Sequence, residues 1–178
     1  MFTKNWYILQ GLNMLADEQR RLVKLRAPEW NGNDSSWYYY YPLRRDINIH
    51  LALNSVKTNL TTISDGVLFG TGDTPASLDD YKLAGDVITN IAASINRTYS
   101  YFVEQQSLKA VYTITNNNTE EITIREVALN VAVPHAISGG KNQYIIDRTV
   151  LDTPVTIPSG GVGQVEYTIT FNLPTATA

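Results

Sequence analysis

Two histidines, His50 and His135, are the first candidates for chemistry, and both lie in strand-like segments. A histidine could act as the general base of a Ser-His-Asp triad, whose members need not be neighbours in the sequence. No nucleophile elbow accompanies them, and no pair of carboxylates is singled out for acid–base work. We therefore expect both histidines to be structural, and keep a hydrolase that uses one of them as an alternative.

A second candidate is the segment Gly70-Thr71-Gly72, because phosphate-binding loops are also rich in glycine. It lacks the Gly-Lys-Ser/Thr ending and the strand–loop–helix context of such a loop. Asp73, Asp79 and Asp80 follow it and could ligate calcium, but their spacing does not match an EF-hand. We expect a plain turn with solvated acids, and we predict no catalytic residue, no cofactor and no metal.

Aromatic residues offer a third kind of site, one for binding. Trp30 is followed by the run Trp37-Tyr38-Tyr39-Tyr40-Tyr41, which favours a strand, and Pro42 ends that strand or places it at an edge. Successive strand residues point to opposite faces, so one face can join the core while the other is exposed or covered by a neighbour. Three interpretations stay open: core plus a subunit interface, which we favour, core alone, or a platform for sugar rings.

One helix is predicted, over Leu12 to Arg26. Its apolar residues recur at three- and four-residue steps, Asn13 could cap its start, and Pro28 ends it. Its basic end could contact an acidic partner or nucleic acid, although we expect a solvated helix face there. Together with the aromatic residues it supplies the predicted interface, which consists of Trp30, Trp37, Tyr38, Tyr39, Tyr40, Tyr41, Arg20, Arg21 and Lys24.

Composition narrows the class of protein. Of the 178 residues, 43% are apolar and 17% are charged, which is typical of a globular chain rather than a disordered one. The net charge of −3 gives no general attraction to nucleic acid or to an anionic membrane. Cysteine is absent, which excludes disulfides and cysteine nucleophiles. No apolar run approaches the roughly 18 residues of a membrane span, and we expect no secretory signal.

The elements that would position these residues are mainly strands. Residues 47–54 alternate between apolar and polar and predict a half-buried strand, with a short helix over 51–60 as the alternative. Val67-Leu68-Phe69 is a short buried run. Residues 86–95 suit a helix or a strand, and we favour the strand. The final strand places Val165, Tyr167, Ile169 and Phe171 on one face.

Two details of the last third can be checked. Asn116-Asn117-Asn118 predicts a hairpin turn into the strand that starts at Ile122. The apolar face of that strand changes from even-numbered to odd-numbered residues, and a β-bulge near Arg125-Glu126 would restore the facing. The whole pattern predicts a mainly β fold: an antiparallel β-sandwich, Ig-like or jelly-roll-like, over 47–178, with a helix and aromatic strand as an extension over 1–46.

Two pieces of the chain resemble a family of proteins. The first is Gly66 to Pro75, with Leu83 downstream. The second joins Thr123 to Leu129 with Asp147 to Leu151, continues through Pro154 to Gly161 and closes with Val165 to Phe171. In this order they resemble segments of tailed-bacteriophage virion proteins, particularly tail, fibre and head-decoration components. The family has Gly where this chain has Ala128, which bears on the local backbone there but not on the fold.

The resemblance implies a non-enzymatic structural component of a phage particle, which acts by self-assembly and by contacts with other virion proteins. Symmetric homo-oligomers are usual for such proteins, and the virion is the expected location, with assembly in the bacterial cytoplasm. We expect no membrane partner and no nucleic-acid partner. A carbohydrate- or receptor-binding module, built on Trp30 and Trp37 to Tyr41, is the alternative.

Overall fold

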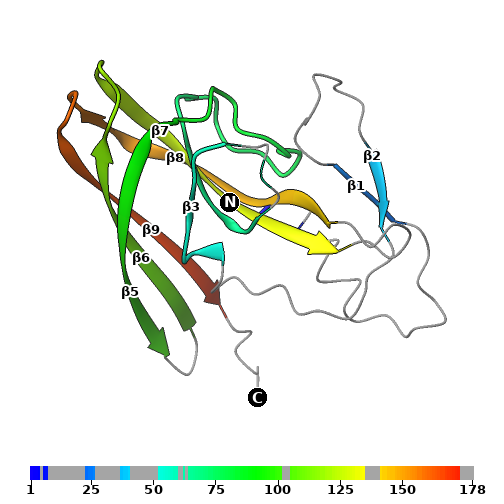
Figure 1. Cartoon of the computed structure of the whole chain (residues 1–178). Coiled ribbons are helices and arrows are strands. Elements are labelled where there is room, and N and C mark those ends of the chain that lie inside the picture. The colour runs from blue at the N-terminus through cyan, green and yellow to red at the C-terminus, as the bar shows by residue number, and fades with distance from the viewer. Residues whose placement is uncertain are drawn as a thin grey trace. The chain divides into compact units, whose positions relative to one another are not determined.

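The computed structural model gives the positions of most of the chain. The residues it describes are 1–4, 6–7, 23–26, 37–40, 52–59, 62, 64–101, 105–134 and 141–172. The strands are β1 (Val23–Arg26), β2 (Trp37–Tyr40), β3 (Val56–Lys57), β4 (Gly66–Gly70), β5 (Ile91–Tyr101), β6 (Gln105–Asn116), β7 (Ile122–Pro134), β8 (Lys141–Ile157) and β9 (Val162–Asn172). The fold is therefore mainly β, as the sequence predicts (Figure 1).

The chain divides into two units, and the first comprises residues 1–89 and 124–154. Its main sheet has the strand order β3-β4-β7-β8, and β4 pairs antiparallel with β7 from Gly66↔Asn130 to Gly70↔Glu126. The predicted buried run is confirmed, because every residue of β4 is buried. A small core forms on this sheet, made of Leu68, Leu83, Ala128 and Ile145.

The edge strand β8 of this sheet is covered by the start of the chain. The backbone of Thr3 donates to the carbonyl oxygen of Ile146 at 2.9 Å, and Arg148 donates to that of Met1 at 3.0 Å. The Thr3 hydroxyl donates to the Ile145 carbonyl at 2.8 Å. Residues 1–4 therefore add a short paired segment to an edge that would otherwise be open.

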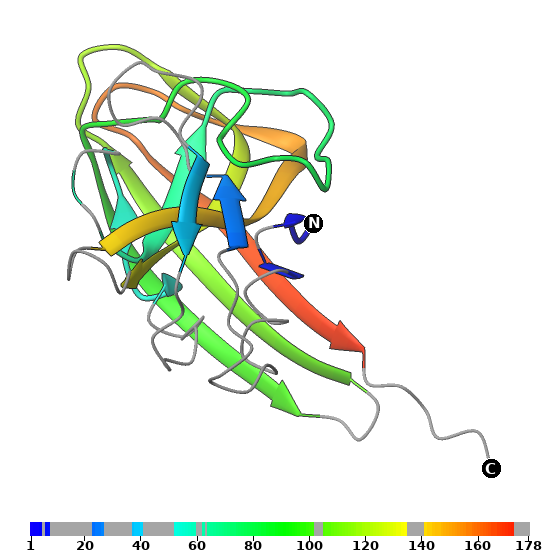
Figure 2. The same ribbon diagram turned by 90° about the vertical axis from the view of Figure 1, so that its right-hand side faces the viewer.

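The second unit comprises residues 90–123 and 155–178, and its sheet has the order β5-β6-β9. The three strands run antiparallel, side by side (Figures 1 and 2). The predicted alternation in the final strand is confirmed: Val165, Tyr167 and Ile169 are buried, and the residues between them are exposed. On β6 the buried face carries Tyr112, where burial raises the pKa of the hydroxyl although the charge of Arg97 opposes the shift.

The N-terminal prediction is wrong where the structure tests it. Residues Val23–Arg26, the end of the predicted helix, form β1 and pair antiparallel with the aromatic strand β2. Pairing with a strand rich in aromatic residues outweighs a helical pattern at its weakest end, since β-branched Val23 favours strands. The predicted aromatic strand is confirmed for Trp37–Tyr40, and the rest of the predicted helix lies outside the described residues.

Two further strand predictions need correction. Ala52 is helical and Leu53 and Asn54 form a turn, so the predicted strand over 47–54 is wrong in its described part. The alternative of a helix over 51–60 is also wrong beyond Ala52, because Val56–Lys57 form β3. The ambiguous segment 86–95 becomes a strand only from Ile91. Before it, Val87 makes a single bridge to Gly70, which closes the loop that follows β4.

The Asn116 turn is not a hairpin. β6 pairs with β5 and β9, whereas β7 belongs to the other sheet, so the turn carries the chain from one sheet to the next. The reason is the buried Asn116 side chain, whose amide donates to the carbonyls of Glu120 at 2.8 Å, Ile157 at 3.0 Å and Pro158 at 3.1 Å. These bonds hold the strand ends together without the ladder of a hairpin.

The predicted bulge does not interrupt the pairing of β7 with β4, which runs unbroken from Glu126 to Asn130. The apolar face changes because β7 becomes buried on both faces: every residue from Glu126 to Val131 is buried. A strand buried on both sides has no single apolar face. The change of apolar face in the sequence thus coincides with the start of this doubly buried run, and the bulge near Arg125-Glu126 stays a prediction.

Candidate functional site

A cluster of buried polar groups is centred on Glu126 of β7, which is 0% exposed. Its Oε1 accepts the backbone N–H groups of Gly72 at 2.9 Å and Gly85 at 2.8 Å. Its Oε2 accepts the N–H of Ala84 at 3.0 Å and the Nε–H of Arg148 at 2.6 Å. The carboxylate is thus held by four donors, which is how a buried charge is made tolerable.

Arg148 of β8 is the partner charge, and it is 1% exposed. Besides Glu126 it binds Asp80, with Nη1 at 2.8 Å from Oδ2, and it donates from Nη2 to the Thr74 carbonyl at 2.8 Å. Burial disfavours the charged guanidinium, but hydrogen bonds to Asp80 and Glu126 outweigh it and raise the pKa of Arg148. The side chain is therefore a fixed cation that ties one loop, residues 71–86, to two strands.

The glycines of the Gly70-Thr71-Gly72 segment serve this contact. A Cβ atom on Gly72 would lie 2.5 Å from Glu126 Oε1 and 2.4 Å from the backbone N of Gly85. A Cβ on Gly85 would lie 2.3 Å from the N of Gly72. Only glycine allows the two backbone stretches to approach each other and the carboxylate this closely.

This loop does bind an anion, but the anion is the carboxylate of the chain itself. Converging N–H groups form such anion sites in many loops, and here Glu126 fills the site. The prediction of solvated acids is wrong for Asp80, which pairs with the buried Arg148, but it is confirmed for Asp79, which is exposed and pairs at the surface with Lys4. Across the described residues no group of three or more acids and histidines is arranged to hold a metal ion.

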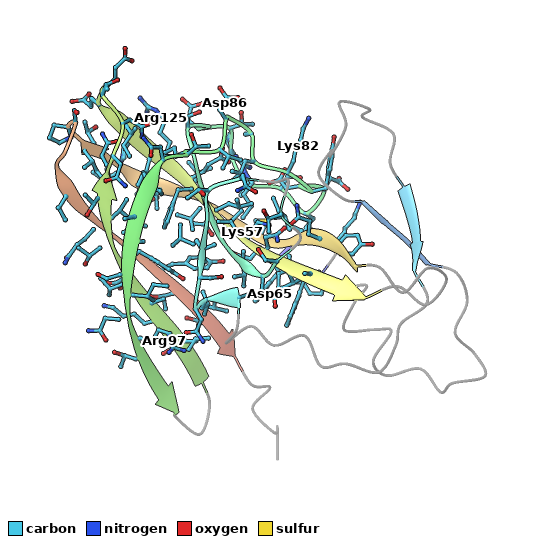
Figure 3. The ribbon with its side chains drawn as sticks, viewed as in Figure 1. Lys57, Asp65, Lys82, Asp86, Arg97 and Arg125 are labelled. Atoms are coloured by element: carbon cyan, nitrogen blue, oxygen red, sulfur yellow. The ribbon has the colours of Figure 1, made fainter. Side chains whose placement is uncertain are left out.

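A second buried polar cluster surrounds Lys57 of β3, which is 5% exposed (Figure 3). Its Nζ donates to Gln143 Oε1 at 2.5 Å and to the carbonyls of Thr62 at 2.6 Å and Ser64 at 3.3 Å. Burial lowers the pKa of Lys57 to about 8, and the charge of Asp65 opposes this shift. The ammonium group is enclosed by acceptors and fastens the β3–β4 connection to β8.

Gly66 makes room for that lysine. A Cβ at Gly66 would lie 2.6 Å from the Cγ of Lys57, so the lysine stem runs along the bare backbone of β4. Beyond it, the amide of Asn130 donates to the Ser64 carbonyl at 2.8 Å and to Gln143 Oε1 at 3.2 Å. The cluster thus links three strands and one loop through hydrogen bonds that a core of alkyl side chains could not make.

The predicted interface stays a prediction, because the structure gives only the strand positions of five of its residues. In the β1–β2 pair Lys24 lies opposite Tyr39, and Tyr38 lies opposite Leu25. Tyr40 lies opposite Val23 and Trp37 opposite Arg26, but the side chains of these strands are not described. The remaining predicted residues lie outside the described residues: Arg20, Arg21, Trp30 and Tyr41, together with the two histidines His50 and His135.

The best-defined exposed surface is the outer face of the sheet β5-β6-β9. Residues of neighbouring strands form rows across it, such as Ser94–Thr113–Gln164 and Thr98–Lys109–Thr168. These side chains are exposed or half-buried, and Lys109 pairs with Glu166 at 2.5 Å. The face is polar and carries few charges, and β5 forms one of its edges.

The sequence interpretation did not identify the buried charges, among them Glu126, Arg148 and Lys57. A signal was present for two of them, because Glu126 lies in the apolar strand Glu126-Val-Ala-Leu-Asn-Val131 and Arg148 follows Tyr-Ile-Ile-Asp147. A charge inside a strand that is otherwise apolar must be exposed on one face or paired. Only the structure shows that these two are paired with each other.

Comparisons with models of protein families, with curated proteins and with solved structures found no match. Among the described residues, no helix has the length and apolar character needed to cross a membrane.

Proposed function

We propose that this chain is a non-enzymatic structural component of a bacteriophage virion, which acts by self-association and by contacts with other virion proteins. The observation that carries the proposal is the sheet β5-β6-β9, with long strands, a polar exposed face and an accessible edge strand β5. Such an edge favours pairing with another chain. The choice of a phage particle rests on the resemblance of two pieces of the chain to virion proteins.

The buried charges support a structural role for this framework. Glu126, Arg148 and Lys57 are each bound by partners within the chain, and these contacts fix loops onto strands. A β-sandwich, Ig-like or jelly-roll-like and antiparallel apart from the parallel pair of β3 with β4, is part of the proposal. The one-sided burial of β6 and β9 supports it.

The test is to find the protein in purified particles. We expect mass spectrometry of virions, from the host in which the gene is expressed, to detect the chain at a fixed ratio to the other particle proteins. We also expect native mass spectrometry of the purified chain to give one defined homo-oligomer. Absence from the particles, or a purified chain that stays monomeric at all concentrations, would contradict the proposal.

A further inference from the structure

Strand β5 is an 11-residue edge of its sheet. Its register with β6 runs without interruption from Ile91↔Asn116 to Tyr101↔Gln106, so no bulge breaks it. In the part of the chain that the structure describes, β6 is its one strand neighbour. Side chains on both of its faces are exposed, namely Ala92, Ala93, Ser94, Asn96, Arg97 and Thr98. The edge away from β6 is therefore accessible.

The backbone groups on that edge follow from the hydrogen bonds of Asn116. Its N–H donates to the Gly161 carbonyl at 3.0 Å, and its own carbonyl accepts from Gly160 at 2.9 Å, so Asn116 bonds on the β9 side. Neighbouring strand residues direct these groups to opposite sides, so odd-numbered residues of β6 bond toward β5. Their partners on β5 are even-numbered. Odd-numbered residues of β5 thus direct N–H and C=O outward.

This edge lacks the features that normally prevent pairing. Natural edges carry proline, lysine or a bulge, or are covered by another segment. The edge strand β8 has two of these, Pro154 within it and the paired residues 1–4 beside it. β5 reads IAASINRTYSY, with no proline, no glycine, no lysine and one charged residue, Arg97 (Figure 3).

We infer that β5 pairs antiparallel with β5 of a second copy of the chain, about a two-fold axis through Asn96. This inference deepens the proposed function and rests on it. In this register all 11 residues have a partner, and odd-numbered residues face odd-numbered residues, so the outward backbone groups meet. A two-fold axis makes the contact closed and isologous, as expected for a dimer.

The single charge selects this register. Arg97 lies opposite Ile95 of the second copy, and Ser94 lies opposite Thr98. Moving the axis to Arg97 would place the two arginines opposite each other, which destabilises a strand pair. Moving it to Ile95 would leave residues at the strand end without a partner. The polar pairs fall on the face that is already polar in the sheet β5-β6-β9.

Cysteine cross-linking tests the axis directly, because the chain contains no cysteine. In this register Asn96 lies opposite Asn96 of the second copy, in a non-hydrogen-bonded pair. The Cα atoms of such a pair are about 4.5 Å apart, which is a separation that a disulfide spans. The control is Thr98→Cys, on the same face of the same strand. Thr98 of the second copy is displaced from it by four residues along the strand. This separation is roughly 13 Å, which is too far for a disulfide. We expect mild oxidation to link Asn96→Cys into dimers and to leave Thr98→Cys unlinked.

A charge pair tests the register independently and without cysteine. Ile95→Lys places a cation opposite Arg97 of the other copy, twice per dimer, whereas Ile95→Glu places an anion there. The two variants are matched because both lose the same half-buried isoleucine. Two cross-strand pairs of this kind change the dissociation constant by about ten-fold in opposite directions. Sedimentation velocity should therefore find Ile95→Lys the weaker dimer and Ile95→Glu the tighter one.

The outcomes separate this inference from the proposed function. Dimers of Asn96→Cys together with opposite shifts for the two Ile95 variants support the pairing. An oligomer that forms as well with Ile95→Lys as with Ile95→Glu, or that links Thr98→Cys as readily as Asn96→Cys, overturns the pairing and leaves self-association standing. A chain that is monomeric at all concentrations overturns both.

Discussion

Replacing Glu126 with glutamine is the sharpest test of the buried polar network, because it removes one charge and keeps the volume. The carbonyl of the new amide could still accept the N–H groups of Gly72 and Gly85. Its NH2 group, however, would face the N–H of Ala84 and the Nε–H of Arg148, which now lie 3.0 Å and 2.6 Å from the carboxylate oxygen. The N–H of Ala84 and the Nε–H of Arg148 would then each face the NH2 group, another donor, in place of an acceptor. The guanidinium of Arg148 would keep only Asp80 as an anionic partner.

The expected loss of stability is large. Breaking a buried ion pair by removing one partner costs about 3–5 kcal/mol, and each buried donor left without an acceptor costs about 1–3 kcal/mol. Both figures describe the loss of the same contacts, so they are not added. We therefore expect the free energy of unfolding to fall by about 3–5 kcal/mol. With a slope of about 2 kcal/mol per M of urea, the unfolding midpoint should fall by about 2 M.

The assay is urea unfolding followed by circular dichroism and by fluorescence, with Glu121→Gln as the matched control. Glu121 is exposed, so its replacement should change the stability by less than about 0.5 kcal/mol. Replacing both Glu126 and Arg148 by apolar residues should cost less than the sum of the single changes, with a coupling of about 1–3 kcal/mol. If Glu126→Gln unfolds at the same urea concentration as Glu121→Gln, the network does not stabilise the fold in this way.

Three further outcomes are expected. The pKa of Lys57 falls from 10.5 in the unfolded chain to about 8 in the folded protein, a difference worth about 3 kcal/mol. Between these two pH values the unfolded chain therefore binds more protons than the folded protein. The free energy of unfolding of the wild type, relative to that of Lys57→Met, should rise from pH 8 to 10.5. Urea titrations in which this difference does not change with pH would contradict the expectation. Asn116→Ala should lose about 2 kcal/mol or more, because three carbonyls lose their donor, while Asn117→Ala, whose side chain is exposed, should lose little in the same assay. Gly72→Ala should lose about 1–3 kcal/mol in thermal unfolding, because the new methyl group collides with backbone and carboxylate; an unchanged melting temperature would mean that the loop is not held closely.

Local periodicity in the sequence is enough to predict several features of this fold. The alternation of Val165, Tyr167 and Ile169 with polar residues predicted both a strand and its buried face, since the side-chain period of a strand is two. The turn at Pro158 to Gly161 was equally local, and Gly160 has a φ of 68°, a conformation that favours glycine. The mainly β class followed from many such short segments.

Which strands pair, and which partners the buried charges bind, depends on contacts between segments that are distant in the sequence. Asn116 looked like the start of a hairpin, but its side chain binds the carbonyl of Ile157, 41 residues further along, and the chain changes sheets there. Glu126 meets Gly72 and Arg148 only because β7, β8 and the loop after β4 come together. No local pattern encodes such meetings, since whether a charge can be buried depends on a partner that a distant segment supplies.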